Sequence, residues 1–150
     1  MQLRRVVTGL DARGHATVVS DAAATDVMSV AAIPGWEIAT VGATPRVLIV
    51  PTAADPPARG DQLEPGATRF LIWRLPPVEA GPNPAGMHCT DTVDYIVVLS
   101  GSVSMVMGGG GEVELRAGDC LVQNGTAHEW INRSGADCVM AVVMVGARRS

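Results

Sequence analysis

The second half of the chain alternates short apolar runs with turn-forming residues. The runs rich in Val, Ile, Leu and Met are 69–75, 87–99, 102–107, 112–116, 119–123, 128–132 and 137–145. Turn-forming segments that contain glycine, such as Asn124-Gly125 and the glycines of 108–111, separate one run from the next. Short runs at this spacing, with no helical periodicity between them, are typical of antiparallel sandwiches and barrels. The pattern therefore predicts an all-β fold, an antiparallel sandwich or barrel.

The first third of the chain carries weaker signals. Residues 4–8 and 15–20 are β-rich and flank a loop with Asp and Gly, which predicts a hairpin. Asp21 is suited to cap the Ala-rich segment that follows, which predicts a short helical stretch. Two further strands are predicted at 36–41 and 46–50.

The length and the turn-rich segment 51–66 suggest how the chain is organised. That segment is polar and rich in Pro and Gly, so we expect an exposed connection or a lid over a site. A chain of 150 residues has the usual length of one domain. Within it, we expect residues 1–68 to complete the barrel or a dimer interface, and residues 69–150 to form the barrel.

Composition narrows the classes of function. Hydrophobic residues make up 47% and charged residues 17% of the chain, which excludes a disordered or charge-rich scaffold. The formal net charge is −4 and the arginines are scattered, so no basic surface for nucleic acid is expected. The longest apolar run, 139–145, is too short to span a bilayer, and the N-terminus has no apolar segment of a secretory signal. We therefore expect a soluble, cytoplasmic protein without nucleic-acid or membrane partners.

The three cysteines match neither a metal-binding nor a redox motif. Cys89, Cys120 and Cys138 have no CxxC spacing, and an odd, sparse set is typical of reduced thiols. We expect Cys89 to be inert, and Cys120 and Cys138 to fill small apolar spaces.

Two predicted strands begin with residues suited to chemistry. Alternate residues of a strand point to one face, so His88, Thr90 and Asp94 share a side of the run that begins at 87. His128 and Trp130 share a face of a second run in the same way. The first run becomes apolar further along, so its polar start is expected to line the mouth of a cavity. Two imidazoles and one carboxylate are a sufficient ligand set for a divalent metal.

The stretch 86–145 resembles a cupin, a family with two short motifs. The first motif reads G, five residues, HxH, three or four residues, E, six residues, G. The second reads G, five residues, PxG, two residues, H, three residues, N. The matching positions are His88, Asp94 (for Glu), Gly101, Gly118, Gly125, His128 and Asn132. The departures are Thr90 in place of the second His, Gln123 in place of the Pro, and one residue fewer after Gly118.

The resemblance implies a cupin barrel, a double-stranded β-helix, with extra N-terminal strands. The patterns TxDY and QxGTxH resemble those of small single-domain cupins, which are commonly encoded beside genes of natural-product or aromatic metabolism. Such proteins commonly form homodimers through sheet edges and N-terminal strands, and we expect the same here. The resemblance also implies that His88, Asp94 and His128 hold a divalent metal (Fe, Mn, Zn or Ni), or that none is bound.

The expected function is a metal-assisted lyase, isomerase, cyclase or decarboxylase acting on a small organic substrate. His128, His88 and Asp94 are its candidate catalytic residues. The candidate substrate-binding residues are Thr90, Trp130, Tyr95 and Gln123. Alternatives are an Fe(II)-dependent dioxygenase, metal-free chemistry with a histidine as general base beside Asp94, and non-catalytic binding of a small ligand. A purely structural role for Asp94, bonded to Thr90, also stays open.

Overall fold

A computed structural model of the chain describes residues 3–10, 12–13, 15–44, 63–78 and 86–149. The predicted strand at 46–50 and the part of the predicted loop at 51–62 lie outside the described residues. No described segment forms a helix with the length and apolar character needed to cross a membrane.

All regular elements among the described residues are strands, which confirms the all-β prediction. The bounds are β1 Arg4–Leu10, β2 Ala16–Ala23, β3 Val27–Ser29, β4 Glu37–Thr44, β5 Thr68–Leu75, β6 Thr92–Ser100, β7 Ser102–Met107, β8 Glu112–Arg116, β9 Cys120–Gln123, β10 His128–Ile131 and β11 Cys138–Gly146. Within the second half, each strand lies inside or next to a predicted run, because the glycine turns set the boundaries.

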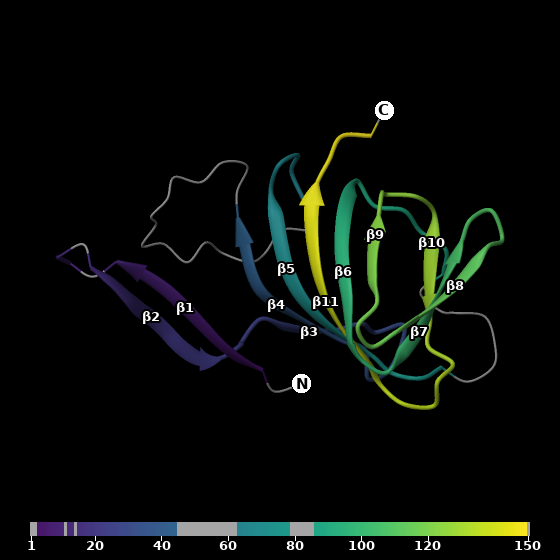
Figure 1. Cartoon of the computed structure of the whole chain (residues 1–150), viewed down its shortest axis with the longest axis horizontal. Helices are drawn as coiled ribbons and strands as arrows, with labels where there is room; N and C mark the ends of the chain where they lie inside the picture. The colour runs from purple at the N-terminus through teal and green to yellow at the C-terminus, as the bar shows by residue number, and fades with distance from the viewer. Residues whose placement is uncertain (1–2, 11, 14, 45–62, 79–85, 150) are drawn as a thin grey trace.

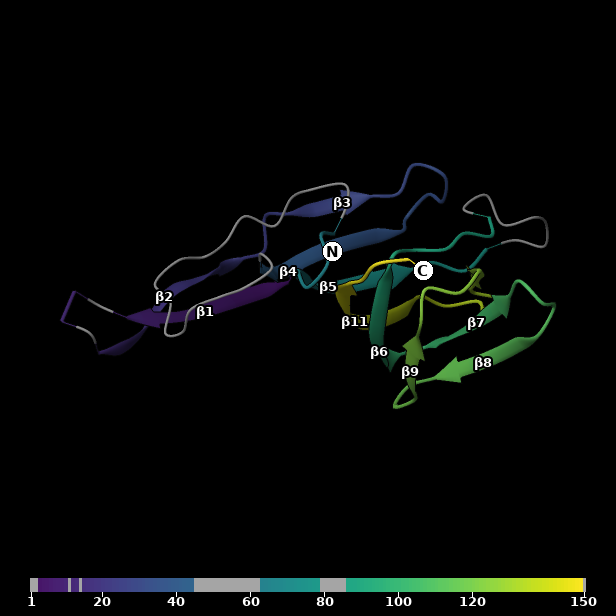
Figure 2. The same cartoon turned by 90° about the horizontal axis from the view of Figure 1, so that it is seen from above.

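Two antiparallel sheets pack against each other and enclose the core (Figures 1 and 2). The larger has six strands in the order β3-β4-β5-β11-β6-β9, and the smaller has three in the order β10-β7-β8. Both contribute to one buried apolar cluster, which includes Leu71, Leu75, Val98, Val103, Leu115, Trp130 and Met140. A third, two-stranded sheet of β1 and β2 projects away from this barrel. The inward faces of the two packed sheets therefore define where a site can be built.

Two local predictions were wrong. Asp21 does not cap a helix: it lies in β2 opposite Val6 of β1, and its carboxylate accepts two hydrogen bonds from Arg4, at 2.8 and 2.7 Å. The carboxylate is bonded to Arg4, and the backbone of β2 pairs with β1, so the side chain is not used to cap a helix. Cys120 is exposed rather than a core filler, because the alternation of β9 turns Leu121 and Gln123 inward instead.

Cys138 is buried at the start of β11, as expected of a small apolar residue. Burial raises the pKa of its thiol to about 11. The thiol therefore stays protonated at neutral pH and acts as packing.

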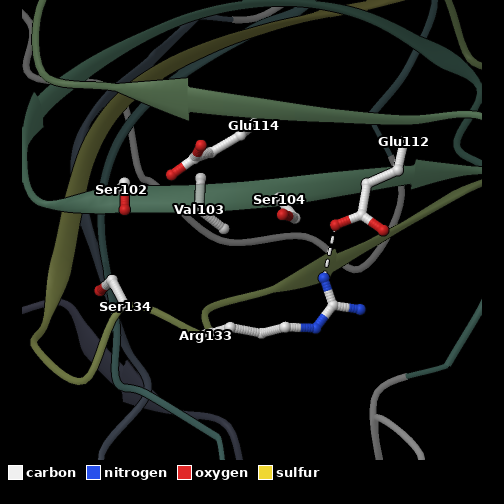
Figure 3. A pocket seen from close by; sticks show the side chains of 7 residues that line it. All are labelled: Ser102, Val103, Ser104, Glu112, Glu114, Arg133 and Ser134. Atoms are coloured by element: carbon white, nitrogen blue, oxygen red, sulfur yellow. Dashed lines mark hydrogen bonds and ion pairs between the residues drawn. The ribbon is translucent and has the colours of Figure 1, made fainter.

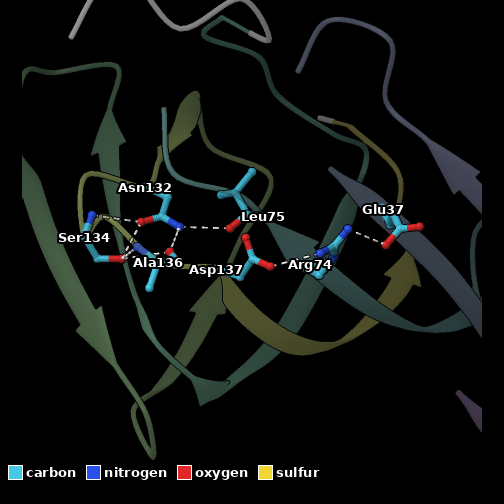
Figure 4. A network of polar contacts seen from close by, with 7 residues as sticks. All are labelled: Glu37, Arg74, Leu75, Asn132, Ser134, Ala136 and Asp137. Atoms are coloured by element: carbon cyan, nitrogen blue, oxygen red, sulfur yellow. Dashed lines mark hydrogen bonds and ion pairs between the residues drawn. The ribbon is translucent and has the colours of Figure 1, made fainter. Parts of the chain in front are cut away.

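Asn132 joins the two sheets at one end of the barrel (Figure 4). It directly follows β10, and its side chain is completely buried. Its amide nitrogen donates to the carbonyl oxygens of Leu75 at 2.8 Å and Ala136 at 2.7 Å. Its amide oxygen accepts from the backbone N–H of Ser134 at 2.9 Å and from the Ser134 hydroxyl at 2.7 Å. All four of its hydrogen-bonding positions are therefore filled.

An ion-pair chain lies beside this junction on the outer surface (Figure 4). Arg74 of β5 contacts Glu37 of β4 at 2.7 Å and Asp137 at 2.9 Å. These ion pairs link β4, β5 and the loop before β11. All three side chains are partly exposed, so its contribution to stability is small beside that of buried Asn132.

Replacing Asn132 by Leu is expected to lower the free energy of unfolding by at least about 2 kcal/mol, since buried backbone groups lose their partners. Chemical denaturation followed by circular dichroism measures this change. The exposed Asn124 provides the control, because Asn124→Ala is expected to change stability little. Equal effects at the two positions would show that the Asn132 network does not hold the sheets together.

Candidate functional site

Two histidines are held side by side by the backbone. His88 precedes β6 and His128 begins β10, and the two residues form an isolated antiparallel bridge. Each backbone N–H donates to the other residue's carbonyl oxygen, at 2.9 and 2.8 Å. The imidazole centroids lie 4.6 Å apart, with an angle of 51° between the ring planes. The structure thus brings together two of the candidate residues, although the strand containing His88 was predicted to be continuous from 87 and begins only at Thr92.

Both rings have the same nitrogen tied to the backbone. Nδ1 of His128 lies 2.8 Å from the carbonyl oxygen of Thr126, and Nδ1 of His88 lies 3.1 Å from that of Gly86. A carbonyl oxygen only accepts, so Nδ1 donates its hydrogen and Nε2 of each neutral ring keeps a lone pair.

His128 is buried, whereas His88 is exposed. Burial lowers the pKa of His128 below its ordinary value, and the nearby His88 lowers it further. The hydrogen bond to Thr126 and the charge of Asp94 oppose this change. His128 is therefore a neutral base at neutral pH.

Asp94 places a buried carboxyl on the inward face of β6. It is 3% exposed, and its Oδ1 has no hydrogen-bond partner. Burial raises the pKa of Asp94, while a hydrogen bond from Thr92 and the charges of His128 and His88 oppose the rise. The Thr92 hydroxyl also lies 2.8 Å from the Thr90 hydroxyl, and its single proton serves only one of these acceptors at a time. A buried carboxyl so weakly satisfied has an increased tendency to hold a proton.

Gln123 closes the site opposite Asp94. It pairs with Asp94 in the register of β9 and β6, and it is buried. Its amide oxygen accepts from the backbone N–H of Thr126 at 3.1 Å and from the Thr126 hydroxyl at 2.7 Å. Since Thr126 also holds the His128 ring, Gln123 fixes the turn that orients that histidine.

The glycine in this turn is required by close packing. Gly125 has a φ of +66°, and a Cβ at this position would lie 2.7 Å from the carbonyl oxygen of Thr90. A larger residue would push the turn away from the segment that carries His88 and Thr90.

The three tryptophans form a wall that runs from His128 into the core. The His128 and Trp130 rings meet edge to face, with centroids 5.9 Å apart. The ring centroids of Trp130 and Trp73 lie 6.4 Å apart, and those of Trp73 and Trp36 lie 6.2 Å apart. Both pairs also meet edge to face. Such geometry is favourable for aromatic pairs and keeps this side of the histidine apolar.

The remaining candidates lie in different places. Thr90 is half-buried next to Thr92, at the edge of the site. Tyr95 is 52% exposed and lies on the opposite face of β6 from Asp94, so it does not join the other residues. Arg69 was not singled out from the sequence. It lies on the same face of β5 as Leu71 and Leu75, and a charged residue among these alternating apolar positions was the signal that could have found it.

The donors do not form a ready metal centre. Among the described residues, no three side chains of His, Cys, Asp or Glu lie close enough together to hold one ion. The two Nε2 atoms have suitable chemistry, but the expected set of His88, Asp94 and His128 does not fit a three-ligand site in this arrangement.

A separate hollow lies on the outer face of the three-stranded sheet (Figure 3). Its volume is about 310 Å³, and Ser102, Ser104, Glu112, Glu114, Arg133 and Ser134 are among the residues that line it. Arg133 contacts Glu112 at 2.5 Å, and hydrogen bonds from Ser104 and Arg133 lower the pKa of Glu112. Its charges largely satisfy one another, so the histidine end of the barrel is the better candidate.

Comparison with a family model gives a match over half of the chain. The model described as "Cupin domain" matches residues 71–145, which include every residue of the site from His88 to His128.

Curated relatives are similar over shorter stretches. Phomopsin biosynthesis cluster protein C′ of Diaporthe leptostromiformis is 48% identical over 48 residues, or 32% of this chain and 25% of that protein. The cupin-domain-containing oxidoreductase fogC of Aspergillus ruber is 38% identical over 76 residues, or 51% of this chain and 35% of that protein. The chain therefore spans about a third or less of the length of these relatives.

A solved structure matches over nearly the full length. Ethanolamine utilization protein Q of Salmonella typhimurium LT2 aligns with 99% of both chains, at a TM-score of 0.53 and 10% sequence identity. At this identity the similarity supports the fold alone.

Replacing Asp94 by Asn is expected to stabilise the protein more at about pH 8 than at about pH 5. The pKa of Asp94 is raised in the folded state, so its contribution to stability is present below the ordinary aspartate pKa. That contribution is lost as pH rises through the folded pKa, where the wild type must bury a charge that Asn lacks. Melting temperatures of both proteins at the two pH values measure the difference.

The exposed Asp91 provides the control, because Asp91→Asn is expected to shift the melting temperature little at either pH. An Asp94→Asn protein that becomes relatively less stable toward pH 8 would instead show that Asp94 is a structural anion.

Proposed function

The chain belongs to the cupin family, and we propose that it is a small-molecule enzyme that moves a proton on an organic intermediate, as an isomerase, lyase, cyclase or decarboxylase. The observation that carries this proposal is the pairing of two buried groups on facing sheets. His128 is a base held in one tautomer by Thr126, and Asp94 is a carboxyl with an unpartnered buried oxygen.

The two pKa shifts suit proton transfer. Burial lowers the pKa of His128 and raises that of Asp94, so both changes favour the uncharged forms. Catalytic bases and acids work best when their pKa values lie near the working pH. The neutral imidazole accepts a proton, and the carboxyl donates one when it is in its protonated form.

In the proposed reaction, Nε2 of His128 removes a proton from a carbon or hydroxyl of the substrate. Protonated Asp94 then donates a proton to a second atom of the same molecule. Transfer of the proton from His128 to Asp94, directly or through a water molecule, restores the starting state. An isomerisation by this route consumes no co-reactant, and the tryptophan wall excludes bulk water from one side.

The names of the relatives support a role in natural-product metabolism. One is called a biosynthesis cluster protein and another an oxidoreductase. The second name favours the alternative of an Fe(II)-dependent dioxygenase, although the described residues do not form a three-ligand site for the ion.

Metal analysis of protein purified without chelator separates the two functions. The proposal predicts turnover that is unaffected by EDTA. Stoichiometric iron, with activity that EDTA removes and Fe(II) restores, would establish the oxygenase instead.

Replacing His128 by Ala is expected to reduce proton transfer by about 10²–10⁴-fold while the protein stays folded. Exchange of solvent deuterium into enolisable 1,3-dicarbonyl compounds, followed by proton NMR, measures this without knowledge of the natural substrate. Melting temperature is measured on the same samples, with His15→Ala as the control because His15 is exposed and lies in the β1–β2 hairpin region.

Equal rates of deuterium exchange by the wild type and His128→Ala would contradict a catalytic role of His128. Binding of the compounds without exchange by the wild type would favour a non-catalytic ligand-binding protein.

We also propose that the chain forms a homodimer through its N-terminal strands. Among the strands that the structure describes, β1 and β2 pair with each other alone, and Val18 of β2 is 54% exposed. A lone two-stranded hairpin is at best marginally stable in water, so a second copy is a suitable partner. Light scattering at micromolar concentration is expected to give the mass of two chains, and the mass of one chain would contradict this.

A further inference from the structure

A cavity of about 770 Å³ opens at the end of the barrel where β5 and β6 begin and β11 ends. Its wall includes inward-facing Arg69 of β5, Thr92 of β6 and Met144 of β11. Figure 1 shows these strand ends meeting beside the C-terminal tail, whose residues 147–149 form part of the rim. Because Thr92 and Asp94 share one face of β6, the cavity adjoins the proposed site.

The described residues of this cavity wall include more arginines than acidic residues, although the protein as a whole is acidic. Among the described residues that line it are the arginines Arg69, Arg148 and Arg149 and two acidic residues, Glu64 and Asp91. Arg149 is occupied: it contacts Asp91 at 2.6 Å and donates to the carbonyl oxygen of Thr90 at 3.2 Å. Within the part of the chain that the structure describes, no ion pair involves Arg69 or Arg148.

The position of Arg69 is unusual for a structural arginine. It lies on the face of β5 that also carries buried Leu71 and Leu75, so its charge points the way the core residues do. Charges on inward faces often protect the edge of a sheet, but β5 lies between β4 and β11 and has no free edge. A half-buried guanidinium facing a cavity is well suited to bind a carboxylate with two parallel hydrogen bonds.

We propose that this cavity binds the carboxylate of a small organic acid, with Arg69 as the main contact and Arg148 as the second. The volume is within the range of sites for drug-sized ligands, and Met144 supplies an apolar wall for the rest of the molecule. This inference rests on the proposed function in taking the bound acid as the substrate, whereas binding itself requires no turnover. The substrate would then be an acid whose reacting atoms reach toward Asp94.

Titration calorimetry with benzoate and with its neutral analogue benzamide tests the proposal. Wild-type protein is expected to bind benzoate at least about tenfold more tightly than benzamide, because a charged hydrogen-bonding partner is lost in the amide. Arg69→Gln is expected to weaken benzoate binding by about tenfold or more, and Arg148→Gln by less. Arg116→Gln is the matched control, since Arg116 is exposed on β8 and pairs with Glu114 at 2.8 Å.

The cysteines report where the acid binds. Cys89 lies on the cavity wall, whereas Cys120 is exposed on β9 outside the cavity lining. Benzoate is expected to slow alkylation of Cys89 by iodoacetamide and to leave the rate at Cys120 unchanged. This alkylation measurement uses the wild-type protein, so it does not depend on whether Arg69→Gln folds.

His128→Ala separates a failure here from a failure of the proposed function, because that variant is expected to bind benzoate as the wild type does. Equal affinity for benzoate and benzamide, no protection of Cys89, or no measurable benzoate binding would each overturn the carboxylate site. Loss of benzoate binding in Arg69→Gln, with binding kept in Arg116→Gln, supports the carboxylate site independently of the catalytic proposal.

Discussion

The backbone bridge between His88 and His128 is the constraint on which the site depends. It joins β10 of the small sheet to the segment that enters β6 of the large sheet, with two hydrogen bonds of 2.9 and 2.8 Å. The same pairing sets the imidazole rings 4.6 Å apart. The contact that joins the two sheets here is therefore also the one that brings the two rings together, and the Gly125 turn beside Thr90 makes the close approach sterically feasible.

The two ends of the barrel satisfy their buried polar groups in different ways. At the Asn132 end, the amide has a partner at every position, and the result is a junction between the sheets. At the histidine end, Asp94 is equally buried but keeps an oxygen without a partner. An unsatisfied buried carboxyl opposes folding, so its presence here is better explained by chemistry than by stability.

Much of this arrangement was predictable from the sequence, for definite physical reasons. Glycine turns and strand alternation fixed the strands from β5 to β11, and they placed Asp94, His128 and Trp130 on inward faces. They could not show that the strand containing His88 is interrupted before Thr92, because alternation carries no information about where pairing stops. The outward position of Tyr95 did follow from its parity with Asp94, although its aromatic ring had made it a candidate for substrate binding.

Other features depend on tertiary contacts that no local pattern contains. The approach of Arg69, Arg148 and Arg149 brings the start of β5 beside the C-terminal tail, which follows the neighbouring strand β11. The pairing of Asp21 with Arg4 across the hairpin likewise overrode its local preference for a helix cap. The sequence did not predict the arginine cluster or the Asp21–Arg4 pair because the residues of each are far apart along the chain.

The proposed chemistry requires His128 to be a neutral base with a free Nε2 lone pair at neutral pH. Nitrogen-15 NMR of the imidazole rings tests it directly, and the chain has only three histidines to assign. His128 is expected to carry its proton on Nδ1 and to stay neutral to a lower pH than a free histidine. A charged ring at neutral pH, or a proton on Nε2, would contradict it.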